Sequence, residues 1–300
     1  MLEYDVIIIG GGPAGLSAGI YAARARLKTL VIEQAITGGQ IVLTSEIENY
    51  PGFPELQTGF ELGQAIEKQA KKFGVEIKQG IVSSVDLKSK TIEFGKENIT
   101  GKYIVVATGS EPGKLGITGE AEYFGRGVSY CATCDGAFFK DKVVAVIGGG
   151  DSAVEEAMYL SKIAAKVYLV HRRDELRAVK IIQEKAFANS KIEFLLSHIP
   201  IEIKGDKTVN SIVLQNKKTG ENVKKEISGV FFYVGQNPNT GFLKGQCKLN
   251  EKGFIVTNEK METSVDGVYA AGDVRDTVLR QVVTACADGA VAASEIAKRV

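Results

Sequence analysis

The sequence predicts an α/β fold of two similar three-layer domains, the second inserted into the first. Three observations support this prediction. A strand–glycine–helix–strand pattern opens the chain near residue 5 and returns near residue 142. An apolar strand ending in glycine follows each copy, at 103–112 and at 229–239. One more strand and helix follow the second copy, and they cannot form a domain alone, so we expect them to complete the first domain.

Composition limits the classes of function. The chain has 300 residues, 44% of them hydrophobic, which is enough for two domains of about 150 residues. Its 37 basic and 36 acidic side chains nearly cancel, so bulk charge predicts no nucleic-acid or membrane partner. The first residues show no signal peptide, and their apolar run is far shorter than the ~20 residues of a membrane span. We therefore expect a cytoplasmic protein.

The first copy begins with residues 5–9, a continuous apolar run typical of a strand buried on both faces. Residues 14–26 have helical spacing, and residues 29–32 form a second strand that ends in Glu33. A Rossmann-like dinucleotide site is predicted where glycines let the backbone approach a pyrophosphate and an acid binds a ribose hydroxyl. By motif alone the nucleotide is FAD or NAD, held by Gly10, Gly12, Pro13, Ala14, Gly15 and Glu33.

The second copy lies 138 residues further on, with a strand at 142–147, a helix at about 152–164 and a strand at 166–170. Its loop contains Gly148, Gly150, Asp151, Ser152 and Ala153. The position that holds Glu33 in the first copy is His171 here. Arg172 and Arg173 follow it, with Arg177 one helical turn on. Guanidinium groups match phosphate oxygens, so this cluster predicts a 2′-phosphate and hence NADPH, unless it is only a solvated charged face.

The last strand and helix imply two chain crossings, near residues 112–117 and 239–245. We expect residues 1–113 and 244–300 to form an FAD-binding domain, and residues 114–243 to form an NADPH-binding domain. The final strand should end at Gly272 and Asp273, and the first turn of the final helix should hold Arg280 and Gln281. Both crossings contain glycine and proline, as hinges often do.

A pair of cysteines, Cys131 and Cys134, lies in the inserted domain just ahead of the second glycine loop. A zinc site needs four ligands, and the two other cysteines and two histidines have no ligand spacing, so we expect no metal. A buried structural pair remains possible. The remaining interpretation is a reversible dithiol, since the CxxC spacing lowers one thiol pKa and an adjacent flavin can pass it two electrons.

The motifs GGGPAG, GGQ, ENYPGF, ATGS, CATCDG, GGGDSAVEEA, HRRDELRA, AAGDV and RQ occur in this order along the chain. In these motifs the sequence resembles the low-molecular-weight thioredoxin reductases of bacteria and archaea. The resemblance implies a homodimer with FAD and a redox-active Cys131–Cys134 disulfide. It further implies that Cys134 faces the flavin, that Cys131 attacks the disulfide of thioredoxin, and that Asp135 is the acid that protonates the thiolate. A turn or helix-capping role is the alternative for Asp135.

The same resemblance implies two sets of binding residues. The FAD set adds Gly39, Gln40, Asn49, Asp273, Arg280 and Gln281 to the first loop, and the NADPH set is the second loop with His171, Arg172, Arg173 and Arg177. The acceptor stays open between thioredoxin and a glutaredoxin-like or peroxiredoxin system. Reduced ferredoxin is an alternative electron source, although the intact second motif argues against it. This chain departs from the family pattern at one place. Many relatives have two aromatic residues directly after CATCDG, whereas here Ala137 precedes Phe138 and Phe139.

Overall fold

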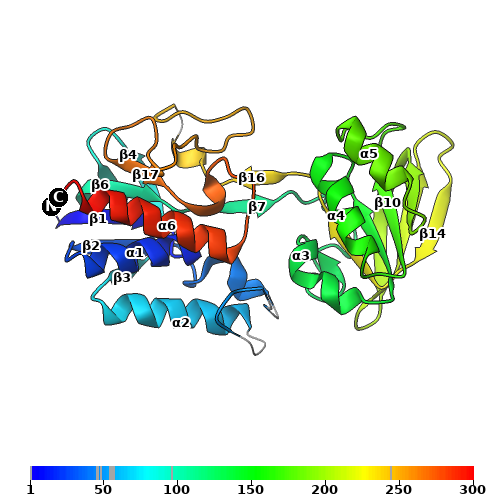
Figure 1. The fold of residues 1–300 in the computed structure, drawn as a ribbon, viewed down its shortest axis with the longest axis horizontal. Coiled ribbons are helices and arrows are strands. Elements are labelled where there is room, and N and C mark those ends of the chain that lie inside the picture. The colour runs from blue at the N-terminus through cyan, green and yellow to red at the C-terminus, as the bar shows by residue number, and fades with distance from the viewer. Residues whose placement is uncertain (1, 45–46, 48, 54–57, 96, 244) are drawn as a thin grey trace. The chain divides into compact units, whose positions relative to one another are not determined.

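The computed structural model describes all residues except 1, 45–46, 48, 54–57, 96 and 244. The chain divides into two compact units (Figure 1): a flanking unit, residues 1–111 and 237–300, and an inserted unit, residues 112–236. The chain re-enters the flanking unit before residue 243, where the sequence had placed the boundary. Asn239 N–H donates to the carbonyl of Gly109 at 3.0 Å, and Leu243 is fully buried in the flanking core. Lys244, the predicted first residue of the returning segment, lies outside the described residues.

The flanking unit is built on a seven-stranded mixed sheet. Five strands run parallel in the order β3, β2, β1, β6, β17, with β1 at Leu2–Ile9, β2 at Thr29–Glu33, β3 at Glu76–Gln79, β6 at Glu97–Val106 and β17 at Val268–Ala270. Two antiparallel strands extend the sheet from the other half of β6: β5 (Thr91–Phe94) pairs with β6, and β4 (Val82–Asp86) pairs with β5. The strand and helix of the returning segment thus complete this sheet, as the sequence predicted.

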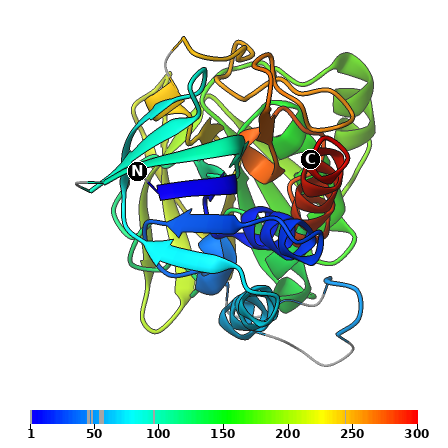
Figure 2. The same ribbon diagram turned by 90° about the vertical axis from the view of Figure 1, so that its left-hand side faces the viewer.

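Helices cover one face of this sheet, as Figure 2 shows. They are α1 (Pro13–Arg24), α2 (Gly59–Lys72) and α6 (Val282–Ala297). Helices α1 and α6 pack closely through small residues, since a Cβ on Gly289 would lie only 2.1 Å from the carbonyl oxygen of Ala14. A second apolar cluster on the other face contains Leu87, Leu243 and Ile255, which gives the predicted three layers.

The inserted unit repeats the plan on a five-stranded parallel sheet in the order β11, β10, β9, β15, β8. The strands are β8 (Val128–Ser129), β9 (Val143–Ile147), β10 (Lys166–His171), β11 (Ile192–Leu196) and β15 (Gly229–Phe232). One face carries α3 (Ala132–Asp135), the 3₁₀ turn η2 (Gly136–Phe139), α4 (Asp151–Ser161) and α5 (Lys180–Phe187). The other face carries the antiparallel strands β12 (His198–Gly205), β13 (Val209–Asn216) and β14 (Asn222–Glu226). The two-domain α/β prediction is confirmed.

The two chain crossings form one two-stranded ribbon. Strand β7 (Ser110–Pro112) pairs with β16 (Gln236–Pro238), and Gly113 N–H donates to the carbonyl of Gly235 at 2.8 Å. The ends of the inserted unit are therefore neighbours.

Two details of the final segment correct the sequence prediction. Strand β17 ends at Ala270, so Gly272 and Asp273 begin the short 3₁₀ turn η4 (Gly272–Val274). Arg280 and Gln281 precede α6, and Gln281 is its N-cap residue, whose N–H donates to the hydroxyl of Thr284 at 3.1 Å. No helix in the described part of the chain is long and apolar enough to cross a membrane.

Candidate active site and nucleotide-binding loops

The first glycine loop, residues 10–12, joins β1 to α1. Gly10 has φ +109°, and a Cβ on Gly15 would lie 1.9 Å from the Gly10 carbonyl oxygen, so α1 packs directly on the loop. Helix α1 begins after Gly12 with no side-chain cap, whereas α2 is closed by a capping box of Thr58 and Glu61. The first turn of α1 is thus open to an anionic ligand.

Glu33, at the end of β2, lies against this loop. Its Oε2 accepts the N–H of Gly11 at 2.7 Å, and its Oε1 accepts the N–H of Ala35 at 2.9 Å. A Cβ on Gly11 would lie 2.9 Å from the Cβ of Glu33, so the middle glycine allows this contact. A carboxylate has lone pairs beyond these two bonds, which leaves acceptor capacity for a ribose hydroxyl.

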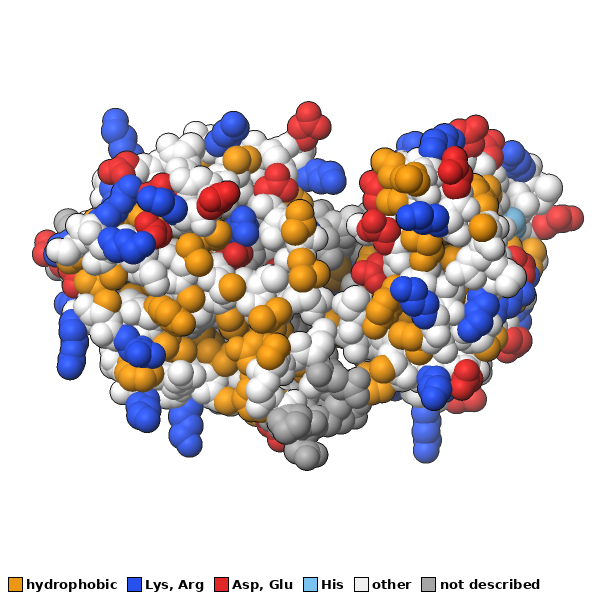
Figure 3. Space-filling view, viewed as in Figure 1, with side chains coloured by type: hydrophobic (Ala, Val, Ile, Leu, Met, Phe, Trp, Pro, Cys, Tyr) orange, Lys and Arg blue, Asp and Glu red, His pale blue; other side chains and the backbone are white. Residues whose placement is uncertain are grey.

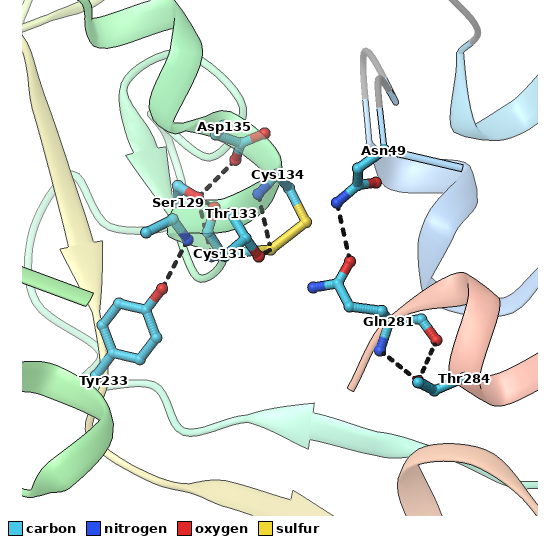
Figure 4. Close-up of a disulfide and its surroundings, with 10 residues drawn as sticks. Asn49, Ser129, Cys131, Thr133, Cys134, Asp135, Tyr233, Gln281 and Thr284 are labelled. Atoms are coloured by element: carbon cyan, nitrogen blue, oxygen red, sulfur yellow. Dashed lines mark hydrogen bonds between the residues drawn. A yellow bond between two sulfur atoms is a disulfide. The ribbon is translucent and has the colours of Figure 1, made fainter. Parts of the chain in front are cut away.

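Two short segments meet the first loop. A Cβ on Gly39 would lie 3.0 Å from the Cα of Gly12, so the start of η1 (Gly39–Leu43) touches the loop. Gln40 next to it donates from Nε2 to the carbonyl of Ser110. Asn49 donates from Nδ2 to Oε1 of Gln281 at 3.1 Å (Figure 4). The predicted FAD residues of both chain segments are thus linked within one unit.

Asp273 is a half-buried acid in the turn after β17. Burial raises the pKa of its carboxyl to about 6, and the nearby Arg280 opposes that rise. Asp288 holds the turn that contains Asp273. It binds Arg275 through two bonds, at 2.6 and 3.1 Å, and accepts the N–H of Gly272 at 3.0 Å. This buried pair fixes the turn that carries Asp273.

The second glycine loop, between β9 and α4, repeats the first. Gly148 is in the left-handed region at φ +156°, and its Cβ would lie 2.6 Å from that of Ala153. A Cβ on Gly149 would lie 2.3 Å from Nδ1 of His171, whereas one on Gly150 would have only Nη2 of Arg177 within 4 Å, at 3.9 Å. Helix α4 also begins without a side-chain cap. The space above Gly150 is therefore open.

His171 is the counterpart of Glu33 and lies under the middle glycine. Its ring is buried, and Nε2 has no hydrogen-bond partner among the described residues. Burial lowers the pKa of the imidazole, and the charges of Arg177, Arg173 and Arg172 lower it further. A neutral ring with three exposed guanidinium groups nearby is suited to an anion.

The remaining residues of this set hold the loop. Arg177 N–H donates to the carbonyl of Gly149 at 2.6 Å, and Asp151 accepts the N–H of Val179 at 2.8 Å. Ser152 lies in the first turn of α4. The structure brings all of the predicted NADPH residues to one end of the inserted sheet.

Cys131 and Cys134 form a disulfide at the start of α3, with their Cα atoms 5.3 Å apart (Figure 4). Cys131 is the N-cap residue of α3, and the N–H of Cys134 donates to its sulfur at 3.2 Å. A hydrogen bond to sulfur stabilises a thiolate, so the opened disulfide favours the charge on Cys131.

Asp135 is a buried acid beside this disulfide. Its Oδ2 accepts the hydroxyl of Ser129 at 2.5 Å, and Ser129 in turn accepts the N–H of Cys131 at 3.1 Å. Burial raises the pKa of Asp135, and the bond from Ser129 opposes that rise. Asp135 is thus linked to the cysteine turn through one hydroxyl group.

Comparisons with known proteins place the chain. The model of the pyridine nucleotide-disulphide oxidoreductase family matches residues 4–289. The chain belongs to this family. It is 50% identical over 305 residues to a thioredoxin reductase of Peptoclostridium acidaminophilum, covering 99% of this chain and 97% of that one. It is 47% identical over 296 residues to the thioredoxin reductase of Bacillus subtilis (strain 168), covering 98% and 93%. A solved thioredoxin reductase of Streptococcus pyogenes MGAS5005 matches with a TM-score of 0.92 and 45% identity, covering 98% and 97%.

As a member of the pyridine nucleotide-disulphide oxidoreductases, the chain is a flavoprotein disulfide reductase, and its cofactors are FAD and NADPH. The residues present fit both groups. Each glycine loop leads into an uncapped helix, and the third glycine of each run, Gly12 or Gly150, has open space above it. The buried Nε of Arg280 and Nε2 of His171 have no partner among the described residues, as expected where a ligand supplies one.

Sequence reasoning overlooked several residues of this family member. The middle glycines, Gly11 and Gly149, had a signal, because each motif contains three successive glycines. Tyr233 had none: its hydroxyl accepts the N–H of Ala132 at 2.6 Å, which joins the end of β15 to the cysteine turn. Phe139 is a core residue whose ring packs edge-on against that of Phe231.

Proposed function

We propose that this reductase transfers two electrons from NADPH to the disulfide of thioredoxin or a thioredoxin-like protein. The observation that carries the proposal is the Cys131–Cys134 disulfide, next to the second glycine loop in a chain whose relatives of about half identity are named thioredoxin reductase. The relatives match nearly the whole chain, a span that includes the cysteine turn and both loops.

When bound, NADPH supplies a hydride and FAD relays two electrons to a disulfide. We assign residues 1–111 and 237–300 to FAD and residues 112–236 to NADPH. FAD would be held by the first loop and Glu33, with the set Gly39, Gln40, Asn49, Asp273, Arg280 and Gln281. NADPH would be held by the second loop with His171, Arg172, Arg173 and Arg177. These arginines supply charge-assisted bonds to a 2′-phosphate, and Glu33 would repel one.

At the disulfide, Cys131 is the residue that we assign to attack the acceptor. The N–H of Cys134 stabilises its thiolate, and a thiolate is the nucleophile in disulfide exchange. Asp135 would supply the proton to the other sulfur, for which burial suits it by favouring the protonated form at higher pH.

We further propose a homodimer formed through the flanking unit. Exposed hydrophobic side chains gather over α1 and α6 in Figure 3, including Tyr21, Val283 and Val291. Apolar surface of this kind is typical of a subunit interface. We place the enzyme in the cytoplasm, where thiols are kept reduced.

The test is a coupled assay of NADPH oxidation with thioredoxin from the same organism, in parallel with a glutaredoxin-like protein and a peroxiredoxin. Thioredoxin should give the highest kcat/KM. Cys131→Ser should stay yellow and still be bleached by NADPH under nitrogen, but it should not reduce thioredoxin. Full thioredoxin turnover by Cys131→Ser, or reduction only by ferredoxin, would contradict the proposal.

A further inference from the structure

Glu156 lies on the face of α4 that supports the cysteine turn. The same helix face carries Tyr159 and Leu160, three and four positions after it, and Ile163 lies just beyond the end of the helix. The same three side chains are the nearest neighbours of a Cβ built on Gly136, at 3.3, 3.2 and 3.6 Å. Gly136 directly follows Asp135, so Glu156 belongs to the surface on which the turn rests.

The carboxyl group of Glu156 has one buried oxygen, Oε2, without a hydrogen-bond partner among the described residues. Burial, with a smaller contribution from Glu155, raises the pKa of this carboxyl to about 7. An unpaired buried carboxylate destabilises a fold, so a structural role does not account for it.

Tyr233 connects Glu156 to the disulfide. The Tyr233 hydroxyl accepts the N–H of Ala132, between the two cysteines, and the carbonyl of Tyr233 lies 2.6 Å from the Cβ position of Gly148. Burial is the main cause that raises the pKa of Tyr233, and the charge of Glu156 is the next, followed by smaller effects of Asp135 and Tyr159. The charge of Glu156 is therefore felt at the residue that binds the cysteine turn.

We propose that Glu156 is a proton-holding residue of the redox centre, which takes up one proton when the Cys131–Cys134 disulfide is reduced and releases it when the disulfide forms again. The inference rests on the proposed redox cycling of this cysteine pair. It adds to Asp135 a second acid with a different role, since Asp135 transfers a proton to sulfur while Glu156 stores one.

Reduction of the acceptor to two thiols needs one proton beyond the hydride of NADPH, and Glu156 would supply it. Opening a disulfide to two thiols consumes two electrons and two protons, but NADPH brings a hydride, which is two electrons and one proton. In the proposed reduced state the S–S bond is broken, one sulfur carries a proton, Cys131 is a thiolate, and Glu156 holds the second proton. When the acceptor disulfide is reduced, both protons leave on its two thiols and the Cys131–Cys134 bond closes.

The direction of the proton movement follows from charge. The charge of Glu155, on the same helix, acts on Glu156, and the charges of Glu156 and Asp135 both act on Tyr233 after β15. None of these is a cation, so the new thiolate adds negative charge that nothing there offsets. A like charge raises the pKa of a carboxyl, so Glu156 binds a proton more tightly in the reduced enzyme. Glu156 should therefore take up the proton in a pH range that begins near 7, its pKa in the oxidised enzyme, and ends at its higher pKa in the reduced enzyme.

The test measures the reduction potential of the cysteine pair against pH in the FAD-loaded enzyme. The enzyme is equilibrated with dithiothreitol redox buffers from about pH 6 to about pH 9, and the reduced fraction is read by alkylation and mass spectrometry. Just above pH 7 the wild-type slope should be steeper than that of Glu156→Gln by up to about 29.6 mV per pH unit, a tenfold change in the equilibrium constant. Glu155→Gln, an exposed neighbour on the same helix, should keep a slope as steep as that of wild type, in a window shifted to lower pH because the charge of Glu155 raises the pKa of Glu156.

Equal slopes for wild type and Glu156→Gln would overturn the inference while leaving the proposed function intact. A cysteine pair that does not change oxidation state in these buffers would overturn both. A second measurement does not need the variant to fold. Reduced-minus-oxidised infrared spectra of wild-type enzyme, with and without ¹³C-labelled glutamate, should show a protonated glutamate carbonyl gained on reduction, and its absence would refute the idea.

Discussion

The two glycine loops have the same strand–glycine–helix arrangement but differ in the side chain beneath the middle glycine. In the flanking unit this side chain is Glu33, which accepts the N–H of Gly11, and in the inserted unit it is His171, packed on Gly149. The carboxylate offers hydrogen-bond acceptors to a ribose. Beside the neutral imidazole, the local electrostatic potential is set by three arginines. We therefore propose that one position, 23 residues after the first glycine of each loop, selects which of the two nucleotides is bound.

The largest effect is expected when the arginines of the inserted unit are replaced. Arg172→Ala combined with Arg173→Ala should raise the KM for NADPH by roughly 10- to 100-fold for each hydrogen bond removed, because a charge-assisted bond contributes about 1.5–3 kcal/mol. The KM for NADH should barely change. Steady-state kinetics with both nucleotides would decide, and an equal rise for the two would show that these side chains do not bind the 2′-phosphate.

The matching change in the flanking unit is Glu33→Ala. It removes the acceptor of the Gly11 and Ala35 N–H groups along with a partner for the ribose. The dissociation constant of FAD should rise by roughly 10-fold or more, measured by flavin fluorescence on deflavinated protein. The binding of NADPH is the internal control. A variant that retains FAD as tightly as wild type would remove Glu33 from the site.

The middle and third glycines of the second loop should respond differently to alanine. Gly149→Ala places a Cβ in the His171 ring and should lower the free energy of unfolding by about 1–3 kcal/mol, the usual cost of overpacking. Gly150→Ala meets open space, so its stability should stay within about 0.5 kcal/mol while its affinity for NADPH falls. Denaturant unfolding without nucleotide separates the two effects. Equal stability of both variants would contradict the packing of His171.

The smallest effect is expected at the cysteine turn, which only the inserted unit has. Ser129→Ala removes the hydrogen bond that lowers the pKa of Asp135, so that pKa should rise. The pH profile of thioredoxin reduction should then extend to higher pH on its alkaline side, since the protonated acid persists further. Ser129→Thr, which keeps the hydroxyl, should restore the wild-type profile. A profile unchanged in Ser129→Ala would mean that Asp135 does not set it.

The sequence predicted those parts of the molecule that short-range patterns specify. Both βαβ units, the inserted arrangement and the glycine loops follow from apolar runs and glycine spacing. Glu33 and His171 were found because their distance from the loop is fixed by one helix. Tyr233 and Glu156 could not be found this way, since their contacts join α4, β15 and the cysteine turn, which meet only in the folded sheet. The sequence placed the second boundary after residue 243, whereas the structure divides after residue 236. Glycine and proline mark a turn, but they do not show which core the next apolar residue joins.

The ribbon of β7 and β16 has a consequence for how the chain acquires its structure. The flanking unit joins two segments that are separated by the 125 residues of 112–236, and closing so long a flexible loop costs about 4 kcal/mol of entropy. A folded inserted unit holds its own ends side by side, so much of that cost has already been met when it folds first. We therefore expect amide protection to develop in the inserted unit before β17 docks beside β6. The last strand would then be the latest part of the protein to become ordered.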